Sequence, residues 1–305
     1  MKRLCIVFGA ALVLAGCGGK EPGATSITRG AFRLGCDDAV LPVINHEIQE
    51  FTRLYSDASV TVRSGGAREV IADFAADSIR TIVCARELNK EERDALAAAK
   101  VSIQEYLVAR TAVAVVTNKG VPVVQLRVGQ LDTIFSGAQT RWPGKRGMMI
   151  ELAVGGLNSS VNEVFRRAVL GGGGFDPAAK PFSSSTELLD YVRRTSGAVG
   201  IVPLNWLGGA AEDVAVLSLA SPAMRPDSTF APGEYYSPHP AYVYQGYYPL
   251  IAPVYVYTRN IEQDVSMGFT AFLTSAAGQK IFQSDGLVPA TMPVRLVHLT
   301  SDQVN

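Results

Sequence analysis

The N-terminal part of the chain alternates between short apolar segments and amphipathic ones. Strand-like alternation is found at Phe32–Gly35, Ser59–Arg63 and Arg80–Cys84. Helical spacing follows each of these segments, over Ala39–Tyr55, Arg68–Asp77 and Asn89–Lys100. Strands that alternate with helices in this order are typical of a parallel sheet covered on both faces.

A second set of elements follows a long β-branched stretch, Val101–Thr117. That stretch is too long for a single regular strand, and we expect it to cross between two lobes. The second set consists of helices at Val128–Ser136, Ser160–Leu170 and Ser185–Thr195 and strands at Met148–Val154 and Val199–Val202. Residues 223–249 are rich in Pro, Gly and Tyr and predict a long irregular excursion. It presents an aromatic surface to a partner or covers core at the lobe junction.

The remaining segments predict a return to the first lobe. Pro249–Thr258 is strand-like, and Asp264–Ser275 and Ala277–Ser284 have helical spacing. We therefore predict an α/β fold of two lobes, each a mainly parallel sheet flanked by helices, joined by crossing strands. The first lobe is expected to comprise residues 31–108 and 249–305, and the second residues 109–248. Two domains around two cores are natural for a chain of 305 residues.

The extreme N-terminus has the features of a bacterial lipoprotein signal. Lys2 and Arg3 precede the apolar run Leu4–Leu14, which is too short to span a bilayer. The run ends in Leu-Ala-Gly-Cys, which looks like a lipobox with Cys17 as the lipidated residue. We expect a signal peptide at 1–17, a flexible tether at 18–30, and a membrane-anchored protein facing the periplasm or exterior. The alternative is a cleaved soluble signal with a chance cysteine.

Charge and motif content narrow the function classes. Lys plus Arg and Asp plus Glu each number 28, so the chain lacks the basic excess expected of a nucleic-acid-binding protein. The three histidines, His46, His239 and His298, are widely spaced, which argues against a metal site. The sequence contains neither a Gly-x-Ser-x-Gly elbow nor a His-Glu-x-x-His motif. We expect no covalent chemistry and no cofactor, with an envelope hydrolase as the minor alternative.

Several segments, in order along the chain, resemble the phosphate-binding proteins of bacterial phosphate ABC importers. They are Gln130–Gly137 (QLDTIFSG) with Trp142, Ser196–Val202 (SGAVGIV), Tyr248–Leu250 (YPL), and Ala277–Lys280 (AGQK) with Gly286–Pro289 (GLVP). The resemblance covers roughly residues 32 to 295 and implies a periplasmic-binding-protein-like fold with ligand enclosed between two lobes. It further implies a monomeric receptor that binds a small anion and delivers it to an ABC permease, with phosphate as the first candidate ligand.

The resemblance and the strand ends together suggest a ligand site. The candidate residues are Cys36, Asp37, Asp38, Ser64, Gly65, Arg86, Asn158, Ser159 and Ser160. Asp37 and Asp38 are alternatively helix caps, and so are Ser159 and Ser160. Arg86 is alternatively a salt-bridged arginine. Where the family normally has an arginine, this chain has Gly155, which removes a bidentate partner for phosphate.

Cys36 and Cys84 end two strands that are neighbours in the topology implied by the resemblance. We therefore predict a Cys36–Cys84 disulfide or close thiol pair, with two small buried hydrophobic residues as the alternative. The sequence as a whole predicts an anchored oxyanion receptor. The alternative is an anchored sensor or scaffold with the same fold, whose cleft is degenerate or binds an organic ligand.

Overall fold

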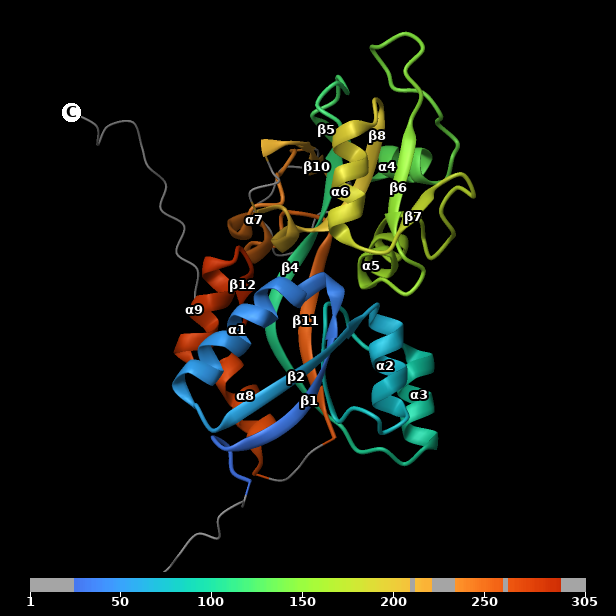
Figure 1. The fold of residues 1–305 in the computed structure, drawn as a ribbon. Coiled ribbons are helices and arrows are strands. Elements are labelled where there is room, and N and C mark those ends of the chain that lie inside the picture. Colours follow the sequence, from blue (N-terminus) through green and yellow to red (C-terminus); the bar gives the residue numbers. More distant parts are fainter. Residues whose placement is uncertain (1–24, 209–211, 221–233, 260–262, 292–305) are drawn as a thin grey trace, which may run out of the picture.

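One hydrogen-bonded sheet runs the length of the molecule (Figure 1). The computed structural model describes residues 25–208, 212–220, 234–259 and 263–291, and within them the main strand order is β2-β1-β3-β11-β4-β8-β6-β7. These strands are β1 (Gly30–Asp37), β2 (Ala58–Gly65), β3 (Thr81–Cys84), β4 (Gln104–Thr117), β6 (Glu151–Gly155), β7 (Lys180–Phe182), β8 (Ala198–Pro203) and β11 (Ile251–Thr258). Two short strands, β9 (Ala215–Val216) and β12 (Val288–Pro289), also pair with β4, while β5 (Gln125–Arg127) and β10 (Ser218–Ala220) pair with each other.

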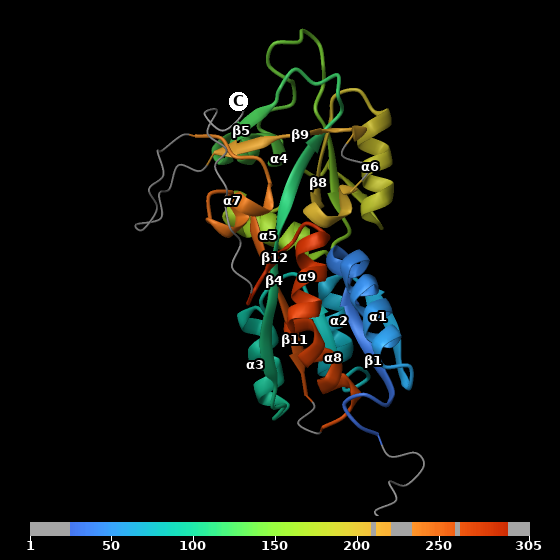
Figure 2. The same cartoon turned by 90° about the vertical axis from the view of Figure 1, so that its left-hand side faces the viewer.

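Helices gather around the two ends of this sheet. The first half of the molecule contains β1 to β3 with helices α1 (Leu41–Leu54), α2 (Ala67–Ala75), α3 (Lys90–Ala98), α8 (Val265–Thr274) and α9 (Ala276–Ser284). The second half contains β6 to β8 with α4 (Val128–Phe135), α5 (Ser160–Val169) and α6 (Ser185–Arg194). Three shorter helices are η1 (Asp38–Val40), η2 (Leu204–Trp206) and α7 (Pro240–Tyr244). In Figure 2, α1, α8 and α9 lie side by side on the first half.

The strand directions explain why the sheet is mixed. β2, β1 and β3 are parallel, and so are β8, β6 and β7. The central strands β4 and β11 run antiparallel to each other and to their outer neighbours. The reason is that β4 leaves the first half and β11 re-enters it. A mainly parallel sheet is therefore the right prediction for the outer strands and the wrong one for the centre.

The segment expected to cross between lobes does so as one strand. Residues 104–112 of β4 pair with β11, and residues 113–117 pair with β8. The prediction that the stretch is too long for one strand is wrong. Because β4 is almost fully buried from Val108 onward, its apolar residues pack on both sides in both halves.

The hydrophobic core is continuous between the halves. Its largest cluster joins Leu34 and Phe269 of the first half to Phe135 and Phe165 of the second. Two smaller clusters belong to one half each. The expectation of two separate cores is wrong, because β4 and β11 carry apolar side chains through the junction.

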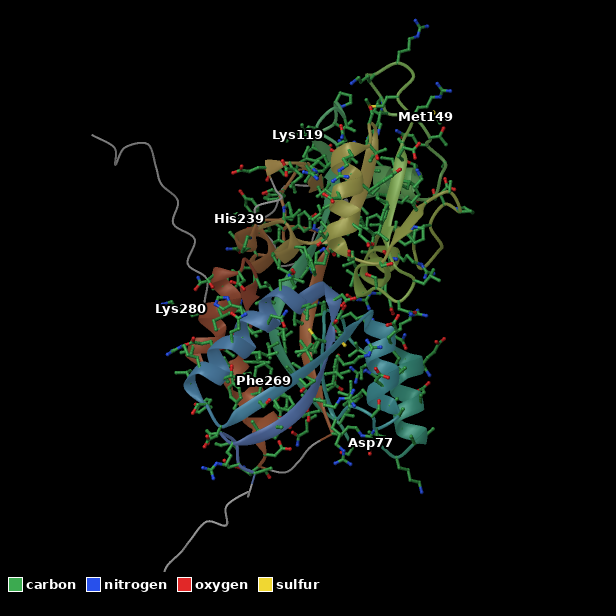
Figure 3. The ribbon with its side chains drawn as sticks, in the orientation of Figure 1. Asp77, Lys119, Met149, His239, Phe269 and Lys280 are labelled. Carbon is green, nitrogen blue, oxygen red and sulfur yellow. The ribbon has the colours of Figure 1, made fainter. Side chains whose placement is uncertain are left out.

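Individual side chains follow the expected division between inside and outside. Phe269 is fully buried and packs on Phe32 and Phe51, whereas Lys280 lies on the outer side of α9 (Figure 3). In the Tyr-rich excursion, Tyr248 is buried and its hydroxyl donates to the Val113 carbonyl at 2.9 Å. Tyr248 thus covers core at the junction, while residues 221–233 of the excursion lie outside the described residues.

The end of the predicted tether is ordered against the first half. Ser26 and Arg29 exchange backbone hydrogen bonds of 2.9 and 3.2 Å, and Arg29 pairs with Asp57 at 3.1 Å. Gly30 already belongs to β1. A flexible tether is therefore the wrong prediction for residues 25–30, whereas Cys17, the signal segment 1–17 and residues 18–24 lie outside the described residues.

None of the described helices is long and apolar enough to cross a membrane.

Candidate functional site

A cavity of about 280 Å³ lies between the two halves. The first half contributes Asp37, Asp38, Ala39, Gly65, Gly66 and Glu69 to its wall. The second half contributes Gly155, Gly156, Leu157, Asn158, Ser159, Val161, Phe182, Ser183, Ser184, Ser185 and Pro203. The carboxyl ends of β1, β2, β6, β7 and β8 therefore converge on one space that is partly open to solvent, which is where open α/β sheets bind ligands.

Asp37 fixes the first-half wall. Its side chain is only 1% exposed and accepts hydrogen bonds from the backbone N–H groups of Ala39 (3.1 Å) and Ala85 (3.0 Å). Burial raises the pKa of Asp37, and hydrogen bonding to Ser160 and to the two amides opposes that rise. The capping interpretation of Asp37 is confirmed, and the same carboxylate also ties β1 to the loop after β3.

Asp38 is the half-buried carboxylate beside it. Burial raises the pKa of Asp38, the charges of Asp37 and Glu69 raise it further, and Arg63 and the Ser64 hydroxyl lower it. Among the described residues, Asp38 forms no ion pair within 4 Å. Asp38 thus lines the cavity, and no cationic side chain of the described residues lies within 4 Å of its carboxylate.

The loop between β6 and α5 forms much of the second-half wall. The Asn162 side chain, 6% exposed, accepts from the Gly155 N–H at 3.0 Å and donates to the Gly155 and Gly156 carbonyls at 2.7 and 3.0 Å. Ser159 occupies the position before α5, but its hydroxyl makes no capping hydrogen bond. The loop therefore has a fixed shape, and the capping alternative for the Ser159 side chain is wrong.

A second loop, which was not among the candidate site residues, also lines the cavity. Phe182 ends β7, and Ser183 to Ser185 lead into α6. Ser184 caps α6 by accepting from the Glu187 N–H at 3.2 Å. The run of three serines before a helix is the signal that identifies this loop, because it places hydroxyl donors at a second helix N-terminus.

Arg86 does not reach the cavity. Its guanidinium is 2% exposed and donates to Glu92 through two hydrogen bonds of 2.6 and 2.8 Å. Its Nε lies 3.1 Å from Glu163 on α5. The ion-paired alternative for Arg86 is therefore the observed one, and the described residues that line the cavity include no Lys, Arg or His.

The other candidate residues divide into two groups. Asp37, Asp38, Gly65, Asn158 and Ser159 line the cavity. Cys36, Ser64 and Ser160 lie behind its wall, where Ser160 and Cys36 are buried. Glu69 and Phe182 are cavity residues that the sequence analysis missed.

Cys36 and Cys84 are free thiols on neighbouring parallel strands. Burial raises the pKa of both far above the ordinary value, and each lies close enough to Asp37 for that charge to raise it further. The disulfide prediction is not met in this structure. Both side chains are fully buried and pack as small hydrophobic residues, which is the alternative interpretation.

The walls of the cavity touch each other at one rim. The Arg68 N–H donates to the Asn158 carbonyl at 3.3 Å, and the Asn158 side-chain amide donates to Glu69 at 2.9 Å. Near the junction, Trp206 donates to the Asp38 carbonyl at 2.9 Å. The two halves are therefore held together on two sides of the cavity. Within the described residues, no group of three or more potential metal ligands occurs.

The structure places a cavity between two halves of one α/β sheet, at the carboxyl ends of its strands, which is where α/β binding proteins hold their ligands. Residues 22–277 match the family described as the PBP superfamily domain, and the chain belongs to that family. The resemblance inferred from the sequence motifs is thus confirmed.

Several proteins similar to this chain are phosphate-binding proteins. The chain is 26% identical over 148 residues to the phosphate-binding protein PstS of Staphylococcus aureus, a match that spans 46% of this chain and only 45% of that protein. A phosphate ABC transporter substrate-binding protein from Clostridium perfringens, solved with bound phosphate, matches 86% of this chain and 100% of its own, at 19% identity and a TM-score of 0.72. An ABC-type phosphate transport receptor from Vibrio cholerae matches 86% of this chain and 100% of its own, at 18% identity and a TM-score of 0.66. These relatives are binding proteins and not enzymes.

Proposed function

We propose that this protein is the lipid-anchored solute-binding receptor of an ABC importer and captures a small oxyanion, phosphate being the reference ligand. The observation that carries the proposal is the convergence of two helix N-termini, those of α5 and α6, on a cavity shared by both halves. Backbone N–H groups at helix N-termini bind oxyanions without any basic side chain. The family and the named relatives support the same class of function.

Capture works by closure and involves no covalent step. The two halves act as two lobes, residues 31–108 with 249–305 and residues 109–248, and the crossing strands β4 and β11 act as the hinge. The hydroxyls of Ser159, Ser183 and Ser185 add donors around the oxyanion. Release opens the lobes toward an ABC permease.

The anchor completes the proposal. Lipidation at Cys17 holds a monomeric receptor at the outer side of a membrane, facing the periplasm or exterior. One acyl-modified cysteine next to a polar segment keeps the receptor close to its permease.

Titration calorimetry of the purified mature protein tests the proposal. We expect heat and a rise in melting temperature with millimolar phosphate or a simple phosphate ester. A panel of phosphate, phosphonate and sulfate ligands that gives neither signal would overturn the oxyanion receptor.

One observation favours a second candidate, an anchored sensor or scaffold whose cleft binds an organic ligand. Among the described residues, the cavity wall has no basic side chain, because Gly155 stands at the family's arginine position and Arg86 is held by Glu92 and Glu163. Uptake measurements separate the two functions. Deletion of the gene lowers import of the bound oxyanion if the protein is a receptor, and leaves import unchanged if it is a sensor.

A further inference from the structure

The charges around the cavity are unusual for a site that binds an oxyanion. Its wall contains the carboxylates of Asp37, Asp38 and Glu69 and, among the described residues, no cationic side chain. A phosphate dianion in this space meets like charges that no lining arginine or lysine offsets. Asp38, which forms no ion pair among the described residues, therefore favours a ligand that brings its own positive charge.

The two walls offer opposite chemistry. The second half presents hydrogen-bond donors, namely the start of α5, the start of α6 and the hydroxyls of Ser159, Ser183 and Ser185. The first half presents acceptors. A ligand that fits both walls carries an oxyanion at one end and a hydrogen-bond donor at the other.

Among the three carboxylates, Asp38 is the one that is free to bind a ligand cation. Both oxygens of Asp37 already accept backbone N–H groups. Glu69 accepts from Asn158 at 2.9 Å and lies 3.8 Å from Arg63. Asp38 has the Ser64 hydroxyl and the more distant charge of Arg63 near it, but it forms no ion pair within the described residues.

The size of the cavity permits more than a bare ion. Its volume of 280 Å³ is many times the roughly 10–15 Å³ that a single water molecule needs. Apolar side chains of Val161, Phe182 and Pro203 line part of the space and suit a short hydrocarbon linker.

From these observations we infer that the ligand is a small zwitterion that joins a phosphoryl oxyanion to an ammonium group, as in an aminoalkyl phosphonate. This inference rests on the proposed function, because it places the oxyanion at the α5 and α6 N-termini. The ammonium then pairs with Asp38, and Glu69 adds a weaker attraction.

Calorimetry with three probes tests the inference. 2-Aminoethylphosphonate is compared with ethylphosphonate, which lacks only the amine, and with inorganic phosphate. We expect the aminated ligand to bind the intact protein at least tenfold more tightly than either of the others. In Asp38→Asn that advantage falls to less than threefold, while ethylphosphonate binds as well as before or better.

A matched variant, Glu91→Gln, removes a carboxylate from the exposed face of α3 and should leave the tenfold preference intact. If phosphate or ethylphosphonate binds as tightly as the aminated ligand to the unaltered protein, the zwitterion inference is wrong and the oxyanion receptor stands. If none of the three probes binds, both ideas fail. Should Asp38→Asn not fold, the comparison of ligands on the unaltered protein decides the question.

Discussion

Arg86 and Glu163 join the two halves of the molecule beside the cavity. Arg86 lies in the loop after β3, Glu163 lies in the first turn of α5, and Arg86 Nε is 3.1 Å from a Glu163 oxygen. Arg86 also holds Glu92, which is 15% exposed, by two hydrogen bonds. A guanidinium that the family resemblance assigned to the ligand is therefore used to hold the two halves together.

We predict that Arg86→Met lowers the free energy of unfolding by about 3 kcal/mol at neutral pH, because the loss of one partner leaves largely buried carboxylates without their cation. Arg86 and the Asn89 N–H hold the pKa of Glu92 below its ordinary value against the opposing effect of burial. A lowered pKa in the folded state gives stability that is present above the ordinary value of 4.5 and is lost as the pH falls through the folded value. The difference between the two proteins in urea denaturation should therefore shrink in acid.

The matched control is Lys90→Met. Lys90 pairs with Asp94 at 2.5 Å, but the two side chains are 88% and 63% exposed. Solvent screening leaves such a pair with about 0.5 kcal/mol or less. Equal losses of unfolding free energy in Arg86→Met and Lys90→Met would show that burial does not make the Arg86 ion pairs more stabilising than an exposed pair.

The sequence predicts much of the site because strand ends can be read from local pattern. Asp37 ends the apolar strand β1 and Asp38 follows it, while Asn158 and Ser159 follow β6, so parallel strands bring them to one edge. β7 escapes prediction because its three residues are too few to show alternation, and the Phe182 loop is missed with it. The partner of Arg86 also escapes, because Glu163 lies far along the chain and only tertiary packing brings it close.

The fold, like the site, can be predicted from the sequence only where it depends on local pattern. Element order and most boundaries follow from hydrophobic periodicity, which is a local property. The antiparallel centre of the sheet depends instead on the direction in which β11 returns, and the shared core depends on β4 being buried in both halves. Neither relationship leaves a local trace in the sequence.

Glu47 gives a prediction for pH dependence. It is fully buried in α1, neither carboxylate oxygen has a hydrogen-bond partner among the residues that the structure describes, and burial together with the charge of Asp285 raises its pKa to about 9. Asp285 itself faces His46 at 3.2 Å. An acid whose pKa is raised on folding keeps its proton in the folded state and loses it in the unfolded state, so stability falls as the pH rises from about 4.5 toward 9.

Glu47→Gln removes this titration. We expect the variant to be about 3 kcal/mol more stable than the unaltered protein at pH 8 and similar to it at pH 4. The measurement is urea denaturation at several pH values. If the difference in unfolding free energy between the two proteins is the same at every pH, the pKa of Glu47 does not change on folding.

Cys36 and Cys84 are expected to be unreactive in the native protein. Both are fully buried, and their raised pKa values keep them as thiols, whereas the thiolate is the reactive form. Iodoacetamide followed by peptide mass spectrometry should label neither residue in the folded protein. Both should be labelled in guanidinium without a reductant, and labelling only after reduction would instead demonstrate a disulfide.

Gly66 lies in close contact with the opposite half of the molecule. A Cβ atom at Gly66 would lie 2.8 Å from the backbone carbonyl of Asn158 on the opposite wall, which is closer than real contacts allow. The backbone of Gly66 has a φ of −62°, which alanine adopts without strain. Alanine at this position therefore acts through the contact across the cavity and not through its own backbone.

We predict that Gly66→Ala holds the two halves apart and weakens binding of phosphate or 2-aminoethylphosphonate at least tenfold, because the β2–α2 turn and the β6–α5 loop can no longer approach. Small-angle scattering should show a larger radius of gyration than for the unaltered protein. Gly129→Ala in α4 is the control, since a Cβ there meets no atom of the described part of the chain within 4 Å. It should leave the affinity and the radius unchanged and, as a replacement of glycine within a helix, raise stability by up to about 1 kcal/mol. An unchanged affinity in Gly66→Ala would mean that ligand binding does not require the contact between Gly66 and Asn158.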